Sequence, residues 1–226
     1  LAAMCAQTRV VISTVGPYAL YGETLVATCA DSGTDYCDLT GEVHWIAAML
    51  DKYEQRAQAS GARIVNCCGF DSLPSDLGVH FLQRHARERF GAPCTRVKLR
   101  VKAMRGTFSG GTVASLVNFA KEVRANPALR KQLANPYSIC PEGYRPEVRQ
   151  PNPKGASFDP DADSWIAPFI MASCNTRVVQ RSNALSGQAY GAEFKYDEAM
   201  MTGRGTKGRL NAYGLAAGLG GFLVGV

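Results

Sequence analysis

The sequence predicts an α/β protein in which a parallel sheet covered by helices is joined to a smaller α+β part with an antiparallel sheet. Two observations lead to this prediction. In the first third, apolar runs rich in β-branched residues alternate three times with stretches of helical apolar spacing, which is typical of βα units. After residue 92 this pattern stops, and residues 126–168 hold eight of the eleven prolines. We therefore expect two domains, 1–92 and 93–226, with a long irregular excursion at 126–168.

The first third contains three pairs of a strand and a helix. The expected strands are 9–14, 35–41 and 62–70. The expected helices are 21–33, 42–61 and 74–91. Gly33 stands where a left-handed residue ends a helix, and Pro74 suits the first turn of its helix. Because the strands read as solid apolar runs, we expect both faces of this sheet to be covered.

The second part is expected to contain a different sheet. Residues 95–106 alternate between polar and apolar, as a strand with one wet face does, and residues 109–125 have helical spacing. Strand-like alternation returns at 176–185 and at 189–200. We therefore expect a small antiparallel sheet with a helix across it.

Composition limits the class of protein. The net charge is +6, but the Lys and Arg residues are scattered and are not interleaved with aromatic residues, so we expect no nucleic-acid partner. The eight cysteines form no C-x-x-C pair, and we interpret them as reduced thiols of a cytoplasmic protein. The three histidines show no spacing typical of metal ligands, so no metal site is expected.

Both ends of the sequence lie within apolar or helical patterns. The chain begins at Leu1 in what resembles the end of a helix, and it stops within the apolar run 211–226. We therefore expect a fragment of a longer chain. The stretch from Ala212 is too short and too rich in glycine to predict a transmembrane helix, while contact with a membrane surface stays open.

Three loops are expected at one edge of the parallel sheet, where open α/β sheets bind their ligands beyond the carboxyl ends of the strands. They read VGPY at 15–18, LTGE at 39–42 and CGFDSLPSD at 68–76. Each also has a purely structural explanation, as a turn or as a helix start capped by Asp71 or Ser72. The functional alternative is a single cleft lined by all three loops.

Two other motifs carry less weight. RGTFSGGT, at 105–112, resembles a phosphate-binding loop only loosely and lacks the lysine of a P-loop, so we favour the start of a helix. No GxSxG sequence occurs, so hydrolase chemistry is not expected.

Four long segments carry a resemblance to a known family. They are residues 8–42, 61–79, 106–118 and 165–185. Together they resemble the saccharopine dehydrogenase-like oxidoreductases, in the branch of the mycobacterial trans-acting enoyl reductases. The resemblance implies the second half of an NAD(P)-binding Rossmann domain, residues 1–92, joined to a substrate or dimerisation domain. The glycine-rich pyrophosphate loop that opens the family's first strand unit does not occur in this sequence, so the choice between NAD and NADP stays open.

The resemblance and the sheet-edge loops together imply the site residues. The cofactor wall beside the nicotinamide is expected to be Thr14, Val15, Gly16, Pro17 and Tyr18. The substrate side is expected to be Gly41, Glu42, Gly69, Phe70, Asp71, Ser72 and Asp76. Tyr18 and Ser72 are the expected catalytic donors to a carbonyl oxygen, whereas Glu42 and Asp76 are expected to orient their neighbours.

The expected activity is hydride transfer from a nicotinamide cofactor to an enoyl or related lipid-linked small molecule. Saccharopine itself is disfavoured as a substrate, because the three loops contain no cationic anchors for a dicarboxylate. The alternative function is that of a non-catalytic family member associated with a membrane or a lipid droplet. A homodimer stays open, and the fragment alone is expected to bind the cofactor more weakly than a chain with the pyrophosphate loop or to be inactive.

Overall fold

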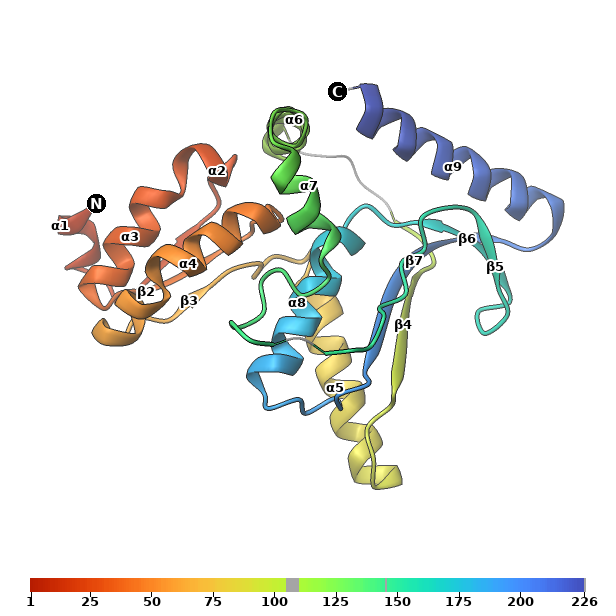
Figure 1. Cartoon of the computed structure of the whole chain (residues 1–226), viewed down its shortest axis with the longest axis horizontal. Coiled ribbons are helices and arrows are strands. Elements are labelled where there is room, and N and C mark those ends of the chain that lie inside the picture. The colour runs from red at the N-terminus through yellow and green to blue at the C-terminus, as the bar shows by residue number, and fades with distance from the viewer. Residues whose placement is uncertain (105–109, 145, 226) are drawn as a thin grey trace. The chain divides into compact units, whose positions relative to one another are not determined.

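The computed structural model describes residues 1–104, 110–144 and 146–225, without the side chains of residues 127, 128 and 222–225 (Figure 1). The chain forms two compact units. Unit 1 comprises Leu1–Pro74 and Phe108–Ile139, and unit 2 comprises Ser75–Thr107 and Cys140–Val226. The domain boundary expected at residue 92 stays a prediction.

Unit 1 contains a parallel sheet of three strands in the order β1-β2-β3. The strands are β1 (Val10–Ser13), β2 (Asp35–Asp38) and β3 (Ile64–Val65). The helices of this unit are α1 (Ala2–Cys5), α2 (Tyr18–Tyr21), α3 (Glu23–Ser32), α4 (Val43–Ser60), α6 (Gly110–Ala125) and α7 (Pro127–Ala134). The alternation of strands and helices predicted for the first third is therefore confirmed.

The ends of α3 and α4 follow from glycine. Gly33 and Gly61 have φ values of 71° and 81°, a left-handed conformation that L side chains rarely adopt and glycine adopts freely. Both helices then turn back into the next strand and pack over the sheet, where Ala30, Ala57 and Ala62 form a tight core. The small side chains allow the helices to approach the strands closely. The helix end predicted at Gly33 is confirmed.

Helices of unit 1 cover one face of the sheet (Figure 1). The register places Ile12, Cys37 and Val65 side by side on the opposite face. Ile12 is 69 % exposed and Val65 is 51 % exposed, so this face is open to solvent. The expectation that both faces are covered is therefore wrong for the described residues. It came from the apolar residues that each strand carries on both faces, whereas the helices pack on only one face.

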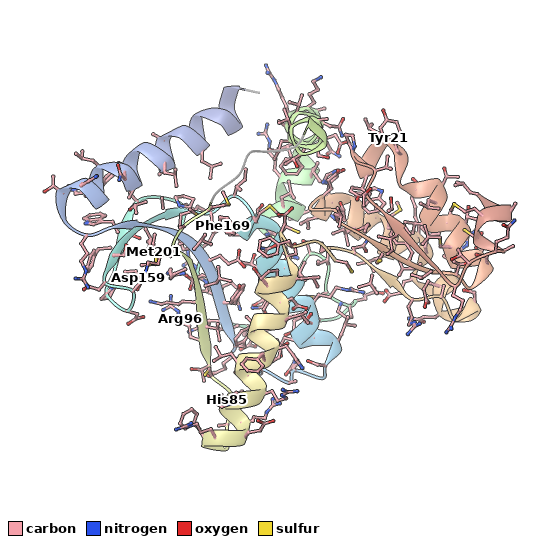
Figure 2. The ribbon with its side chains drawn as sticks, turned by 180° about the vertical axis from the view of Figure 1, so that it is seen from behind. Tyr21, His85, Arg96, Asp159, Phe169 and Met201 are labelled. Carbon is pink, nitrogen blue, oxygen red and sulfur yellow. The ribbon has the colours of Figure 1, made fainter. Side chains whose placement is uncertain are left out.

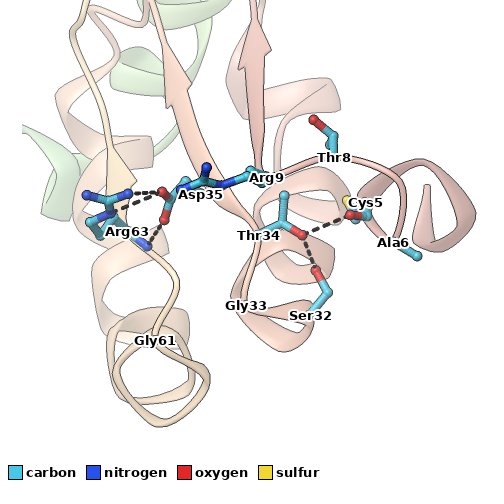
Figure 3. A pocket seen from close by; sticks show the side chains of 10 residues that line it. All are labelled: Cys5, Ala6, Thr8, Arg9, Ser32, Gly33, Thr34, Asp35, Gly61 and Arg63. Atoms are coloured by element: carbon cyan, nitrogen blue, oxygen red, sulfur yellow. Dashed lines mark hydrogen bonds and ion pairs between the residues drawn. The ribbon is translucent and has the colours of Figure 1, made fainter.

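The amino edge of the same sheet has an open pocket of about 500 Å³ (Figure 3). Arg9, Asp35 and Arg63 line it together with the glycines that end α3 and α4. Nε of Arg63 donates to Oδ2 of Asp35 at 3.0 Å, so the Asp35 carboxylate and the Arg63 guanidinium are paired. This pocket lies at the edge opposite the three predicted loops.

Unit 2 contains a sheet of four strands in the order β4-β7-β6-β5. The strands are β4 (Arg96–Val101), β5 (Ser157–Asp159), β6 (Ser164–Pro168) and β7 (Lys195–Gly203). The helices are α5 (Leu73–Phe90), which begins in unit 1, α8 (Ala172–Leu185) and α9 (Gly205–Gly225). β4 pairs with β7 in parallel and the other pairs are antiparallel, so the sheet is mixed rather than antiparallel as predicted.

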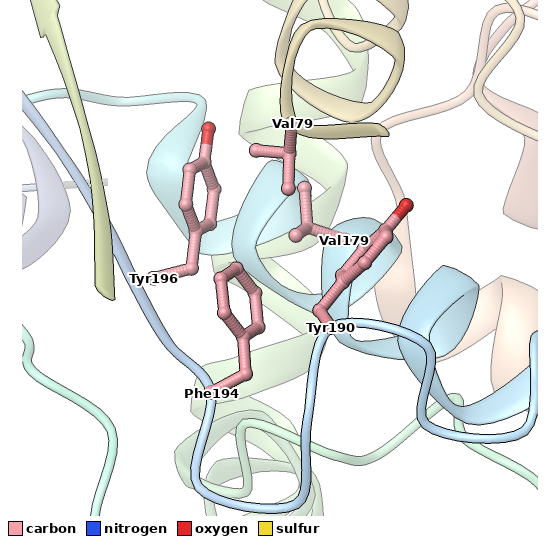
Figure 4. Packing of buried hydrophobic residues seen from close by; sticks show 5 residues of the cluster. All are labelled: Val79, Val179, Tyr190, Phe194 and Tyr196. Carbon is pink, nitrogen blue, oxygen red and sulfur yellow. The ribbon is translucent and has the colours of Figure 1, made fainter. Parts of the chain in front are cut away.

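The two faces of this second sheet differ in chemistry. Ion pairs lie on one of them, where Asp159 and Asp197 bind Arg100 at 2.7 and 2.6 Å. Figure 2 labels Asp159 and, on β4, Arg96. On the other face, Tyr196 packs with Val79 of α5 and Val179 of α8 in a buried cluster (Figure 4). The strand predicted at 95–106 is present as β4, and its charged residues share one face, but the prediction that this face is wet is wrong, because Asp159 and Asp197 are buried there and Lys98 and Arg100 are mostly covered.

Residues 176–185, predicted as a strand, form part of α8 instead. Asn175, Gln180 and Asn183 are buried in this helix, so polar residues occupy positions that an amphipathic helix normally fills with apolar ones. The remaining pattern, with Val178 and Val179 adjacent, resembles a strand. The Pro-rich excursion contains α7, β5 and β6, which the sequence did not predict.

The C-terminal helix α9 packs on the strands of unit 2, with Ala212 fully buried. Leu210, Tyr213 and Leu215 are exposed on it. Within residues 1–104, 110–144 and 146–225, the helices lack the length and apolar character that crossing a membrane requires.

Candidate functional site

The carboxyl edge of the parallel sheet brings the three predicted loops together. The hydroxyl of Tyr18 donates to the carbonyl oxygen of Ser13 at 3.0 Å and accepts from the amide of Leu39 at 3.3 Å, so it joins the first loop to the second. The amide of Cys68 donates to the carbonyl oxygen of Asp38 at 2.7 Å and joins the second loop to the third. The loops lie on one rim, as the parallel strands predict.

Asp38 is the residue that ties the second loop to the third. Its side chain is fully buried and accepts four hydrogen bonds without a cationic partner among the described residues. Oδ1 accepts from the amides of Thr40 and Cys67, and Oδ2 accepts from the Tyr36 hydroxyl and the Asn66 amide group, at 2.7 to 3.1 Å. Burial raises the pKa of Asp38, and the four donors oppose that shift.

Sequence analysis did not select Asp38. The signal was present, because an acidic residue directly at the end of a buried strand needs donors from the adjoining loops. The loops that follow β2 and β3 both lie next to Asp38 and could supply these donors.

Glu42 holds the end of the first loop through hydrogen bonds to its backbone amides. Its Oε1 accepts from the amide of Tyr18 at 2.9 Å, and its Oε2 accepts from the amide of Ala19 at 2.8 Å. The hydroxyl of Ser115, on α6, donates to Oε1 at 2.9 Å. The carboxylate is buried, so the expectation that Glu42 orients its neighbours agrees with these contacts.

The two expected catalytic hydroxyls are both buried. Tyr18 uses its hydroxyl as donor and acceptor within the loops, and burial raises its pKa. Its ring lies 5.5 Å from that of Trp45. Ser72 is 2 % exposed and belongs to a turn in which its amide donates to the carbonyl oxygen of Gly69 at 3.1 Å. In this geometry the Tyr18 side chain positions the loops, and the catalytic role of both residues stays a prediction.

The outer surface of the three loops carries several apolar side chains. Val15 is 63 % exposed and Phe70 is 89 % exposed, and Leu39 lies beside Gly69. Thr14, Gly41 and Asp71 are also exposed, whereas Pro17 is buried.

Gly16 has a packing reason of its own. A Cβ at this position would lie 3.3 Å from Oγ of Ser115 and 3.5 Å from the Tyr18 ring, so the side chain would point into the unit. Tight packing therefore accounts for glycine here without a ligand. Any ligand wall in this loop is better assigned to the exposed Val15.

Asp76 differs from the other expected site residues, because it belongs to unit 2. Ser182 hydrogen-bonds to it, and burial raises its pKa. Its Oδ1 is buried without a hydrogen-bond partner in the described part of the chain. A role for Asp76 in the site stays a prediction.

Helix α6 supplies contacts that the sequence did not predict. Besides Ser115, it carries Glu122, whose Oε2 lies 2.8 Å from Nε2 of His44, and Phe119, whose ring lies 5.4 Å from the His44 ring. These contacts place α6 against the start of α4. The last three residues of the RGTFSGGT motif, 110–112, begin this helix, and its residues 105–109 lie outside the described residues.

Several known proteins that are similar to this chain are named trans-acting enoyl reductase. Over 212 residues the chain is 42 % identical to the trans-acting enoyl reductase of Mycobacterium bovis, covering 90 % of this chain and 50 % of that protein. It is 46 % identical over 209 residues to a Mycobacterium tuberculosis protein provisionally named as a trans-acting enoyl reductase, with the same coverage of both. Identity to the trans-acting enoyl reductase of Mycobacterium ulcerans is 38 % over 208 residues, covering 89 % of this chain and 50 % of that protein.

The chain thus spans about half the length of the curated relatives that it matches. Neither a family model nor a solved structure matches it. The names of the relatives support the expected resemblance to enoyl reductases, and a saccharopine dehydrogenase-like assignment stays a proposal.

Proposed function

We propose that this chain forms part of a nicotinamide-dependent enoyl reductase of the saccharopine dehydrogenase-like class. The observation that carries the proposal is the carboxyl edge of the parallel sheet, where three loops are joined by Tyr18, Asp38 and Glu42. Ligands of open α/β sheets bind at this edge. The similarity to proteins named trans-acting enoyl reductase gives the reaction class.

The loop residues fit a flat, uncharged ring. Val15 offers an exposed apolar side chain at the end of β1, and Leu39 offers another at the end of β2. No charged side chain is required here, because a nicotinamide ring binds by contact with its faces and by hydrogen bonds to its amide. When bound, the cofactor would supply the hydride for the β-carbon of a double bond conjugated to a carbonyl group.

In this proposal the chain's own residues set the position of the loop. Glu42 fixes the amides of Tyr18 and Ala19, so the preceding residue pair, Gly16 and Pro17, is held at the sheet edge. A fixed wall limits the motion of a bound ring and favours one geometry for transfer. The exposed ring of Phe70 supports an apolar substrate, such as an acyl chain bound to a carrier.

Nucleotide titration tests the proposal. In a Trp165→Phe variant, Trp45 is the single tryptophan, and it contacts Tyr18 at the base of the first loop. NADPH or NADH bound at this edge should quench Trp45 emission in a saturable way. Val15→Asp should weaken this binding roughly tenfold or more, since a solvated charge would replace an apolar contact.

Val10→Asp is the matched control, because Val10 is an exposed valine at the opposite end of the same strand. It should leave nucleotide binding unchanged. The proposal fails if neither nucleotide changes Trp45 emission at millimolar concentration, or if the two variants weaken binding equally.

A further inference from the structure

Unit 1 contains two pairs of neighbouring thiols that differ in their exposure. Sγ of Cys5 lies 3.8 Å from Sγ of Cys29, and both residues are buried almost completely. The thiol of Cys68 is hydrogen-bonded to Cys37, and both of these residues are partly exposed. All four are free cysteines.

The backbone fixes the second pair. Cys37 lies on β2 opposite Val65 of β3, and Sγ of Cys68 lies 3.5 Å from the carbonyl oxygen of Val65. The amides of Cys67 and Cys68 are both held by Asp38, the residue next to Cys37. Cys37 is therefore fixed by β2, and the loop that carries Cys68 is fixed by its hydrogen bonds to Asp38 and Val65.

The surroundings of this pair give access from solvent. Cys37 shares the open face of the sheet with Ile12 and Val65, which are both more than half exposed. Cys5 and Cys29 are almost completely buried, although Cys5 is among the residues that line the amino-edge pocket. Reagents in solution can reach Cys37 and Cys68 in the folded chain and should react with Cys5 and Cys29 more slowly.

We propose that Cys37 and Cys68 form a reversible dithiol–disulfide site that reacts with hydroperoxides. The Cys37 thiolate attacks one peroxide oxygen, which breaks the O–O bond and gives a sulfenic acid at Cys37 and water or an alcohol. The Cys68 sulfur then attacks the Cys37 sulfur and expels water, while its proton goes to the leaving hydroxide. Two thiols are oxidised by two electrons, and the peroxide is reduced by two.

The order of attack follows from the environment of the two sulfurs. Burial raises the pKa of Cys68, and the neighbouring Cys37 and Asp38 add to the effect. Cys68 therefore stays protonated and has the role of the resolving thiol. The disulfide would join β2 to the loop after β3. This proposal does not depend on the proposed reductase activity.

Peptide mapping after mild oxidation tests this site. The folded 226-residue chain is treated with hydrogen peroxide, its remaining thiols are alkylated, and tryptic peptides are examined by mass spectrometry. Cleavage at Lys52, Arg56 and Arg63 separates Cys37 from Cys68. We expect one linked pair of peptides that dithiothreitol separates again.

Single variants assign the linked residues. Cys29 shares a peptide with Cys37 and Cys67 shares one with Cys68, so each of Cys29→Ser and Cys67→Ser should keep the link. Cys37→Ser and Cys68→Ser should each abolish it. Cys94→Ser, which changes another partly exposed thiol in unit 2, is the control and should also keep it.

A measurement on the unchanged chain covers the case in which a variant does not fold. Phenylarsine oxide binds two close thiols, so one equivalent should protect Cys37 and Cys68 from alkylation. The proposal is overturned if the arsenical protects neither, if peroxide links Cys67 to Cys68, or if Cys5 and Cys29 become linked at the same rate in the folded chain.

Discussion

The carboxylate of Glu42 gives the sharpest test of how the first loop is held, through the substitution Glu42→Gln. Glu42 receives two hydrogen bonds at Oε1, from Tyr18 and Ser115, and one at Oε2, from Ala19. Glutamine keeps one acceptor oxygen but places an NH₂ group against the third donor. The side chain is buried, so water cannot replace the lost acceptor.

The magnitude follows from the three contacts. Two hydrogen bonds change from charged to neutral acceptors, which costs about 0.5 to 1 kcal/mol each, and one buried donor loses its partner at about 1 to 3 kcal/mol. The free energy of unfolding should therefore fall by about 2 to 5 kcal/mol. The loss should be local first, because these donors lie in one turn.

The assay combines urea unfolding with amide hydrogen exchange. In Glu42→Gln, protection of the amides of Tyr18 and Ala19 should fall together with the unfolding midpoint. Glu23→Gln is the matched control, since Glu23 forms an exposed ion pair with Lys52 and such pairs contribute little. If the two variants have the same midpoint and Tyr18 keeps its protection, the bonds from Glu42 do not hold the loop.

Four further outcomes are expected. Asp159→Asn should lower stability by about 1 to 3 kcal/mol, because Lys98 and Arg100 each lose one carboxylate partner, while Lys98 keeps Asp161 and Arg100 keeps Asp197. Burial alone would raise the pKa of Asp159, but its cationic partners lower it to about 2. The stability that Asp159 contributes in the wild type should therefore be present above the ordinary carboxyl range and be lost as the pH falls toward 2. In acid titrations the variant should lack this pH dependence. Asp38→Asn should cost about 2 to 4 kcal/mol in urea unfolding, because an amide group would face two of the four donors; an unchanged midpoint would contradict the assigned contacts. Gly22→Ala should lower the melting temperature, at a cost of about 1 to 3 kcal/mol, since its Cβ would lie 2.6 Å from the buried Trp45 ring. Gly78→Ala, in the interior of α5 with open space around the added methyl group, should instead stabilise by about 0.5 to 1 kcal/mol.

The part of the fold that local physics controls could be predicted from the sequence. Strands and helices of unit 1 alternate as expected, and the left-handed Gly33 ends its helix as expected. The helix α8 was mistaken for a strand because Asn175, Gln180 and Asn183 are buried there, Asn175 and Asn183 with tertiary hydrogen bonds. No periodicity rule based on apolar residues detects such a face.

Long-range pairing was likewise hidden. β4 pairs in parallel with β7, about a hundred residues later in the chain. In the candidate site, too, the features set by local sequence were predictable and the contacts between distant segments were not. The sheet edge was predictable from strand order, whereas the contact of Ser115 with Glu42 depends on where α6 packs.

The open face of the parallel sheet connects these observations. Parallel sheets are normally covered on both faces, and their strands are apolar on both for that reason. In this chain the helices satisfy one face, while Ile12 and Val65 on the other pack against little among the described residues. Packing within the described chain therefore does not explain the apolar residues on that face. The same exposed face makes the thiol of Cys37 accessible to solvent. Any partner or longer chain that covered this face would therefore bury the apolar residues and also block access to the dithiol site.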